Sequence, residues 1–191
     1  MKSDELLQAV ETATLAILKL VEENFAPLSS SVLNQQPNPE KWSIAECLEH
    51  LNYYASYYNK AIKTAIENAQ QKQWKEVPTF TSTWLGKKSI AAVHPSNTKA
   101  TQTPKALNPS LSTVPPEVVS RFIAGQNEFL TLIQAAKSID LNKTKVRIEV
   151  FKLLKLRLGD LFLFMLAHNQ RHCNQALRAG NFDTSLCLTN V

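Results

Sequence analysis

The chain has 191 residues, of which 44% are hydrophobic and 19% are charged, and its formal net charge is +5. This length suits one domain with its own core, and the presence of only four glycines argues against a turn-rich β protein. A mildly basic balance excludes no class of ligand, because proteins that bind nucleic acid or small anions, or that are simply soluble, can all carry it. We therefore expect one mostly helical domain.

The cysteines and the N-terminal sequence indicate in which cellular compartment the protein is expected. Cys47, Cys173 and Cys187 are odd in number and widely spaced, which fits reduced thiols better than a disulfide framework. The first residues lack the order of a signal peptide, and no apolar run approaches the roughly 20 residues that span a bilayer. The sequence therefore predicts a soluble cytoplasmic protein.

Hydrophobic periodicity predicts four helices, over about residues 4–24, 43–70, 116–137 and 160–180. Ser43 and Glu46 have the spacing of a capping box at the start of the second helix. Asp160 is a suitable N-cap for the last helix, and Gly180 stands where a left-handed C-terminal cap belongs. These signals predict where each helix begins or ends.

A long segment interrupts the helical pattern. Residues 71–116 contain six prolines and no sustained period, so we expect an irregular insert between the second and third helices. A lid over a functional site, a partly disordered linker and a missed element are the alternatives. Trp74, Phe80, Trp84 and Leu85 indicate that the first half of the insert packs against the domain, because a disordered linker rarely needs two tryptophans.

A basic strip follows the third predicted helix. Residues 145–158 partly alternate between apolar and polar side chains, so we expect this segment to be extended or irregular. The strip holds one acid, Glu149, among the cations Lys143, Lys145, Arg147, Lys152, Lys155 and Arg157. It could face phosphate groups, although a solvated surface is the commoner role. Because it lacks the interleaved aromatic residues of a single-strand groove, nucleic acid ranks last among the expected partners.

Three of the four histidines could converge on one point. His168 and His172 are four residues apart on the inward stripe of the last helix, so both imidazoles lie on one face at metal-ligand spacing. His50 lies at the edge of the apolar stripe of the second helix, where a bundle can build a site from several helices. Hydrogen-bonded core histidines are the alternative, and His94 is interpreted as a loop residue. Three imidazoles without a fourth obvious ligand would form an open metal site.

Several residues near these histidines have two interpretations. Glu46, Asn169 and Gln175 could orient the imidazoles, or they could be polar surface residues. Tyr54 or Tyr57 could line a substrate site or act as an acid, or fill the core. The thiols of Cys47 and Cys173 could bind a metal, although small buried residues of this type are commoner.

WSIAECLEHL, followed more than a hundred residues later by LGDLFLFMLAHNQRHCNQAL, resembles the DinB-like superfamily of four-helix-bundle metalloproteins, which includes thiol-dependent transferases and isomerases. The resemblance implies an all-α bundle of up-down-down-up type that forms a single domain over residues 1–191, with residues 71–116 as an insert. It also implies that His50, His168 and His172 are the metal ligands. Glu49, Arg171 and Gln175 match the flanking family positions.

The sequence leaves two main functions open, with nucleic-acid binding through the basic strip as a third that ranks last. The first is a divalent-metal-dependent hydrolase or a thiol or glutathione-like S-transferase that acts on a small molecule, with no catalytic residue assigned beyond the metal ligands. The expected ion is zinc or nickel, with iron or manganese as alternatives. The expected partners are a small-molecule substrate, a low-molecular-weight thiol among the candidates, and a second copy of the chain, without a membrane. The second function is a non-catalytic metal-binding or dimerising bundle protein of the stress-related kind, whose metal shell a fourth side chain such as Cys47 or Glu46 would close.

Overall fold

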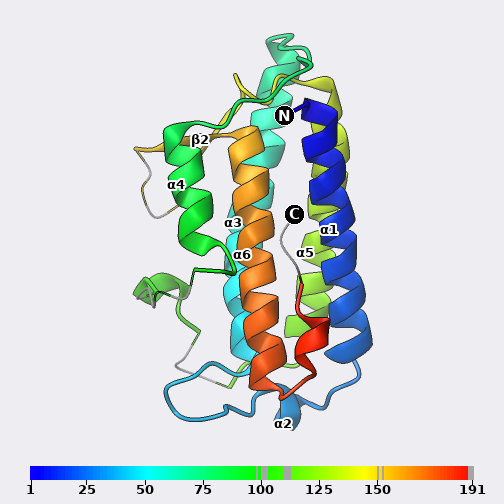
Figure 1. Ribbon diagram of the computed structural model, residues 1–191, viewed down its shortest axis with the longest axis vertical. Coiled ribbons are helices and arrows are strands. Elements are labelled where there is room, and N and C mark those ends of the chain that lie inside the picture. The colour runs from blue at the N-terminus through cyan, green and yellow to red at the C-terminus, as the bar shows by residue number, and fades with distance from the viewer. Residues whose placement is uncertain (98, 100–102, 110–112, 150, 152, 189–191) are drawn as a thin grey trace.

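Four long helices form the body of the protein. The computed structural model describes residues 1–97, 99, 103–109, 113–149, 151 and 153–188. As predicted, the chain is mostly helical, and its long helices are α1 (Ser3–Asn24), α3 (Ile44–Gln71), α5 (Val118–Ala135) and α6 (Leu158–Ala179). They lie side by side, and α1 and α3 each contact both α5 and α6 (Figure 1). None of the helices in the described residues is long and apolar enough to cross a membrane.

The core lies between the apolar faces of these helices. Each face comes from residues three and four apart, which a helix places on one side. In α6, Leu161, Phe162 and Met165 are buried, and the Phe162 ring meets the Phe129 ring of α5 edge to face at 5.6 Å between centroids. Burial of an aromatic side chain of this size contributes on the order of 2 kcal/mol to folding. The apolar first half of α6 thus anchors the half that carries the histidines.

The predicted helix ends are partly right. Ser43 and Glu46 form the predicted capping box, because the Ser43 Oγ accepts from the Glu46 N–H at 3.1 Å and the Glu46 carboxylate accepts from the Ser43 N–H at 2.8 Å. Asp160 is not the N-cap of α6, because that helix begins two residues earlier, after Arg157. Gly180 is not left-handed either, since its φ is −86°, and Asn181 with φ 55° takes that conformation instead.

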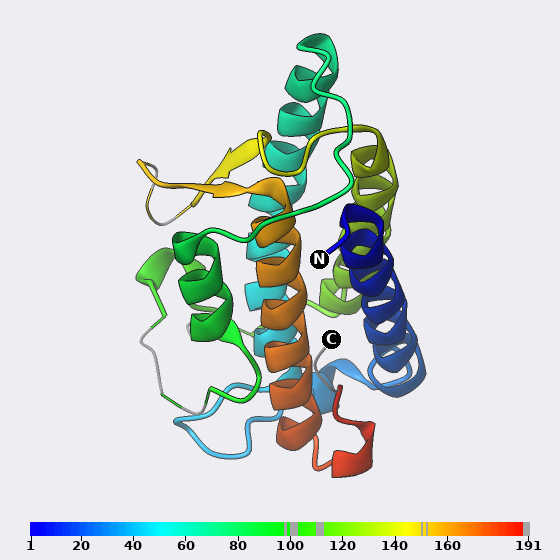
Figure 2. The same cartoon turned by 45° about the horizontal axis from the view of Figure 1, so that its top comes forward.

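The segment predicted to be irregular contains a helix. Helix α4 (Trp84–Val93) lies along the outer side of α6 (Figure 2). Its N-cap is Thr83, and the buried Asp160 carboxylate of α6 accepts bonds from the Thr83 N–H, the Thr83 hydroxyl and the Ser82 hydroxyl. A ten-residue helix is marginal by itself in water, so packing against α6 stabilises it. Sequence periodicity could not reveal this tertiary contribution.

Short helical elements and a hairpin complete the described structure, and two of them are the 3-10 turns η2 (Ala136–Ser138), after α5, and η3 (Thr184–Leu186), after α6. Helix α2 (Ser30–Leu33) follows α1, and the 3-10 turn η1 (Lys105–Leu107) follows α4. Strands β1 (Lys145–Arg147) and β2 (Lys155–Arg157) form an antiparallel hairpin that projects beside α4 and α3 (Figure 2). The predicted extended segment is confirmed for these strands, while Val150 and Lys152 lie outside the described residues.

Candidate metal centre

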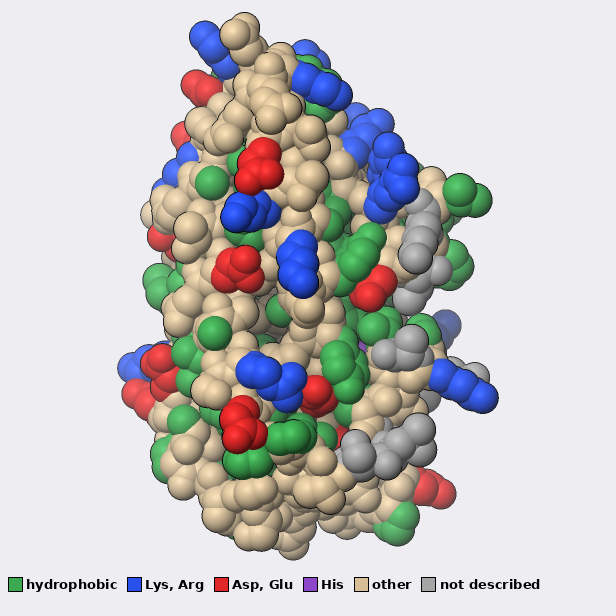
Figure 3. Space-filling model, turned by 180° about the vertical axis from the view of Figure 1, so that it is seen from behind, with side chains coloured by type: hydrophobic (Ala, Val, Ile, Leu, Met, Phe, Trp, Pro, Cys, Tyr) green, Lys and Arg blue, Asp and Glu red, His purple; other side chains and the backbone are tan. Residues whose placement is uncertain are grey.

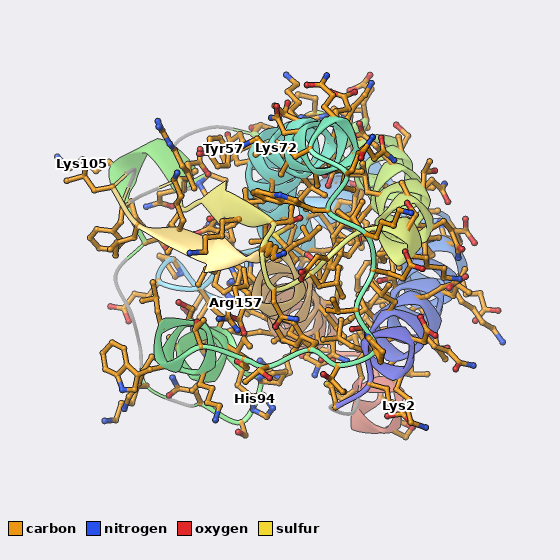
Figure 4. The ribbon with its side chains drawn as sticks, turned by 90° about the horizontal axis from the view of Figure 1, so that it is seen from above. Lys2, Tyr57, Lys72, His94, Lys105 and Arg157 are labelled. Atoms are coloured by element: carbon orange, nitrogen blue, oxygen red, sulfur yellow. The ribbon has the colours of Figure 1, made fainter. Side chains whose placement is uncertain are left out.

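The structure brings the three predicted histidines together. His50 comes from α3, and His168 and His172 lie one turn apart on α6. All three are buried, and one ring nitrogen of each lies within 4.8 Å of the others. His94 does not join them, because it ends α4 on the outer side of the molecule (Figure 4). The i, i+4 spacing on α6 therefore places two imidazoles on the face that meets α3.

A backbone carbonyl of the insert orients His50. The His50 Nδ1 lies 2.8 Å from the carbonyl oxygen of Leu107, the last residue of η1. A carbonyl can only accept, so Nδ1 carries the proton and the neutral ring presents its Nε2 lone pair to the other histidines. The sequence does not reveal this partner, because any residue can supply a backbone carbonyl and no side-chain pattern marks it.

A side chain of the same helix orients His172. The His172 Nδ1 donates to the Gln175 Oε1 at 2.9 Å, so its Nε2 is also left with a lone pair. Gln175 was one of three residues predicted to orient an imidazole, and it does so. An outer partner of this kind is the usual companion of a metal-binding histidine.

His168 has a different environment. Its Nε2 is 3.2 Å from the His50 Nε2, and its Nδ1 is buried with no hydrogen-bond partner in the described part of the chain. Two lone pairs at 3.2 Å would repel each other, so a proton or a cation must lie between these nitrogens. Nitrogen ligands about 2.0 Å from a tetrahedral zinc ion stand about 3.3 Å apart, close to the separation found. The donor set therefore fits a bound divalent ion.

Burial keeps the three imidazoles uncharged. It lowers the pKa of His50 from 6.5 to about 4, against the opposing effect of the bond to Leu107. It also lowers the pKa of His172 to about 3, with the neighbouring His50 as the second cause. The pKa of His168 falls well below its usual value for the same reason, with His172 and His50 adding to the effect. At neutral pH all three can offer a lone pair to an ion.

Aromatic rings surround the histidines and shape a pocket above them. The Trp42 ring stacks on His172 at 5.7 Å between centroids, and the Tyr54 ring lies 4.3 Å from that of His168. Phe164 also stacks on His168, at 5.7 Å between centroids, and its ring lies 6.4 Å from that of Tyr54. The pocket has a volume of about 730 Å³, and all three histidines line it together with Trp42 and Tyr54. This size suits a small organic molecule.

Most other predicted neighbours do not touch the imidazoles. Glu46 belongs to the capping box and also accepts from Gln36, and Asn169 donates to the Gln126 side chain. The thiols of Cys47 and Cys173 are buried outside the histidine group, and burial raises the pKa of Cys173 to about 12. The thiols thus take the commoner role of small buried residues.

The remaining family positions hold the surroundings in place. Glu49 forms a salt bridge with Arg121 of α5 at 2.7 Å. The Arg171 guanidinium donates to the carbonyl groups of His94, Asn97 and Lys99, so it fastens the segment after α4 to α6. Arg171 also lines the pocket, where its role is to shape the wall.

The sequence matches one known protein superfamily. The profile of the DinB superfamily matches residues 13–176, a stretch that includes all three histidines. The chain belongs to the DinB superfamily. No curated protein and no solved structure matches it. Two properties therefore support a functional proposal. They are membership in the DinB superfamily and a three-histidine group that could bind a metal.

Proposed function

We propose that this DinB-superfamily protein is a divalent-metal-dependent enzyme that acts on a small molecule, either as a hydrolase or as a transferase of a low-molecular-weight thiol. One observation carries the proposal. Three buried, neutral imidazoles converge at the wall of a pocket of about 730 Å³, and partners outside the centre hold two of them in the tautomer that a metal needs.

His50, His168 and His172 would hold the ion. Imidazole nitrogens suit zinc and nickel best among the candidates, and iron and manganese remain alternatives. When bound, such an ion supplies a Lewis acid that lowers the pKa of water or of a thiol and so generates a nucleophile at neutral pH.

The rest of the pocket would position a substrate. Burial raises the pKa of Tyr54 to about 12, so its hydroxyl stays protonated and can donate a hydrogen bond. The Trp42 and Tyr54 rings offer apolar faces and exclude water from one side of the histidines. The lining holds one acid, Glu40, and three cations, Lys41, Lys105 and Arg171, so its net positive charge would favour a substrate with an anionic group.

The absence of a fourth protein ligand favours an enzyme over a structural metal site. In the part of the chain that the structure describes, no Cys, Asp or Glu joins the three histidines. Structural sites normally close the shell with four protein ligands, whereas catalytic sites leave a position for water or substrate. A non-catalytic bundle protein, the alternative function, would need a closing residue such as Cys47 or Glu46, and both have other partners or surroundings.

The proposal has two further parts. The first is the up-down-down-up order of the four long helices, which the contacts of α1 and α3 with both α5 and α6 support. The second is a cytoplasmic location, which the three free cysteines support because a reducing compartment keeps thiols unpaired.

Metal analysis tests the proposal first. We expect the purified protein to contain about one divalent ion per chain, and His168→Ala to lose it while the circular dichroism spectrum stays helical. His94→Ala is the matched control, because that histidine lies outside the group and should leave metal content unchanged. Full metal content in His168→Ala would contradict the site.

Activity measurements then separate the enzyme from the structural alternative. Two panels of substrates serve as the assay. One contains hydrolysable esters and amides, and the other contains electrophiles with low-molecular-weight thiols. We expect the metal-loaded protein to turn over members of one of the two panels. Activity should disappear in His168→Ala and persist in His94→Ala. Tight metal binding without turnover of either panel would favour a non-catalytic protein.

A further inference from the structure

A second pocket lies on the other side of η1 from the histidines. It has a volume of about 750 Å³ and runs between α3 and the β hairpin. Its α3 wall includes Tyr53, Tyr57 and Lys60, and residues from Tyr53 to Asn68 span about 22 Å along the helix axis. Among the described residues, none lines both this groove and the histidine pocket. We call it the basic groove.

Cations outnumber acids in the lining of the basic groove. In the hairpin, Val146 pairs with Leu156 and both are buried, so the alternating side chains of Lys145, Arg147 and Lys155 face outward. Lys60 adds a fourth cation from α3, and Glu149 is the acid among the lining residues. None of the four cations forms an ion pair within the described chain. Figure 3 shows Lys and Arg side chains gathered on the side from which the hairpin projects.

The strand register increases the positive potential. Arg147 stands directly opposite Lys155 in the hairpin, and like charges at facing positions destabilise a strand pair. Arg157 is different, because its guanidinium turns to the other side and donates to the Thr81 carbonyl and the Asn142 side chain (Figure 4). An anion bound between Arg147 and Lys155 would relieve the repulsion that the fold leaves in place.

Two tyrosine rings complete the groove. Tyr53 and Tyr57 are one helical turn apart on α3, and Tyr57 projects beside the hairpin (Figure 4). The Tyr57 hydroxyl donates to the Arg147 carbonyl at 3.5 Å, which keeps this ring next to the cations. The basic strip contains one aromatic residue, Phe151, and the fold adds these two tyrosines from a helix about 90 residues earlier in the chain. A phosphate ion would fill little of the groove, whereas a planar ring beside a phosphate fits its size and its chemistry.

We propose that the basic groove binds a nucleotide unit, with phosphate against Arg147, Lys155 and Lys60 and the base against Tyr53 and Tyr57. The same chemistry could come from a free nucleotide or from a single-stranded oligonucleotide. The proposal stands apart from the metal-dependent reaction, because the groove contains none of the three histidines.

Binding of adenosine diphosphate to the full-length protein tests the proposal, measured by calorimetry in the presence of a chelator so that no metal site takes part. We expect the double variant Arg147→Glu with Lys155→Glu to bind at least tenfold more weakly, and Tyr57→Leu to bind several-fold more weakly. Lys60→Glu, on the exposed face of a long helix, should also weaken binding and cannot disturb the hairpin.

Two controls separate the groove from bulk charge and from the histidine pocket. Lys87→Glu with Lys88→Glu changes the net charge equally, but on the exposed side of α4, and should bind as the parent does. His168→Ala should retain adenosine diphosphate affinity. An equal loss in the α4 control, a loss in His168→Ala, or no adenosine diphosphate binding by the parent would overturn the proposal.

Two further ligands test which part of a nucleotide the groove recognises and whether the nucleotide is free or part of a strand. We expect inorganic pyrophosphate to bind more weakly than adenosine diphosphate, and equal affinity would overturn the role of the tyrosines. A single-stranded oligonucleotide of about ten residues gives the second arm. Tenfold tighter binding than adenosine diphosphate would identify a nucleic acid strand as the source of the nucleotide unit, and comparable or weaker binding would identify a free nucleotide.

Discussion

His50 donates its Nδ1 proton to the carbonyl oxygen of Leu107, across 57 residues of sequence and a distance of 2.8 Å. This bond joins the insert to the candidate metal centre. The insert therefore does more than cover the bundle, because it fixes which nitrogen of His50 faces the other two histidines. The Leu107 side chain is buried and anchors the carbonyl in place.

Loosening this anchor should weaken metal binding. We expect Leu107→Gly to lower the affinity for the ion by about 10- to 100-fold, because the carbonyl that orients the His50 ring loses the buried side chain that holds it in place. Competition with a chromogenic chelator measures the change. Lys105→Ala, an exposed residue in the same 3-10 turn, is the control and should keep the parent affinity. If the two variants bind metal equally well, Leu107 does not position His50.

Gln175 provides a similar test for His172. We expect Gln175→Leu to lower metal affinity about tenfold, because the Nδ1 proton of His172 is left without its acceptor. Gln175→Glu retains an acceptor oxygen and should bind at least as tightly as the parent, since a carboxylate makes the imidazole more basic. An equal loss in both variants would indicate a packing role for this side chain instead.

The metal-free protein should lose stability in mild acid. The folded-state pKa of His50 is about 4, below its unfolded value of 6.5, so the unfolded chain binds more protons between these values. The free energy of unfolding is therefore constant above about pH 6.5 and falls as the pH drops towards 4, by at most about 3 kcal/mol for His50. His168 and His172 act in the same direction.

Denaturant unfolding in a chelating buffer over this pH range measures how steeply the free energy of unfolding depends on pH. We expect His50→Gln to show a shallower dependence than the parent, whereas His94→Gln should keep the parent slope. A parent protein whose stability does not change between pH 7 and pH 4 would contradict the burial of neutral histidines.

The attachment of α4 depends on Asp160. This carboxylate is fully buried and accepts from the Ser82 hydroxyl at 2.5 Å and from the Thr83 hydroxyl at 2.9 Å. We expect Asp160→Ala to lower the free energy of unfolding by about 2 to 4 kcal/mol, because the half-buried donors of Ser82 and Thr83 lose a fully buried carboxylate acceptor. Gly86→Ala should also destabilise the protein, since its new Cβ would overlap the Asp160 carboxyl group.

Urea unfolding measures the free energy of unfolding of both variants. Glu67→Ala removes an exposed acid from α3 and should change the stability by less than about 0.5 kcal/mol. If Asp160→Ala is as stable as this control, the bonds to residues 82 and 83 contribute little to holding α4.

The long helices and the three histidines could be predicted because their signals are local in sequence. A stripe of apolar residues defines each helix, and the spacing of His168 and His172 puts both on one helical face whatever the rest of the chain does. The position of His50 at the edge of its stripe indicated a neighbouring helix. The family motif then joined two segments that periodicity alone cannot bring together.

The features that were missed depend on contacts between distant segments. Asp160 was predicted to be the N-cap of its own helix, but α6 already begins at Leu158. Its carboxylate instead accepts bonds from Thr83, the N-cap residue of α4. The Leu107 carbonyl and the stacked Trp42 ring have no sequence signature, since neither a backbone carbonyl nor a single aromatic residue indicates its partner in the fold. Likewise, the basic strip showed its cations but not the tyrosines of α3 that face them.

The segment that carries η1 forms a partition between two cavities. The Leu107 side chain lines the basic groove while its carbonyl holds His50, and Lys105 and Asn108 line the histidine pocket. If a molecule in the groove shifts η1, the Leu107 carbonyl moves with it, and the affinity of the histidines for an ion changes. By reciprocity, the ion must change the affinity for that molecule by the same factor. Communication between the two cavities would then require only the displacement of a single helical turn.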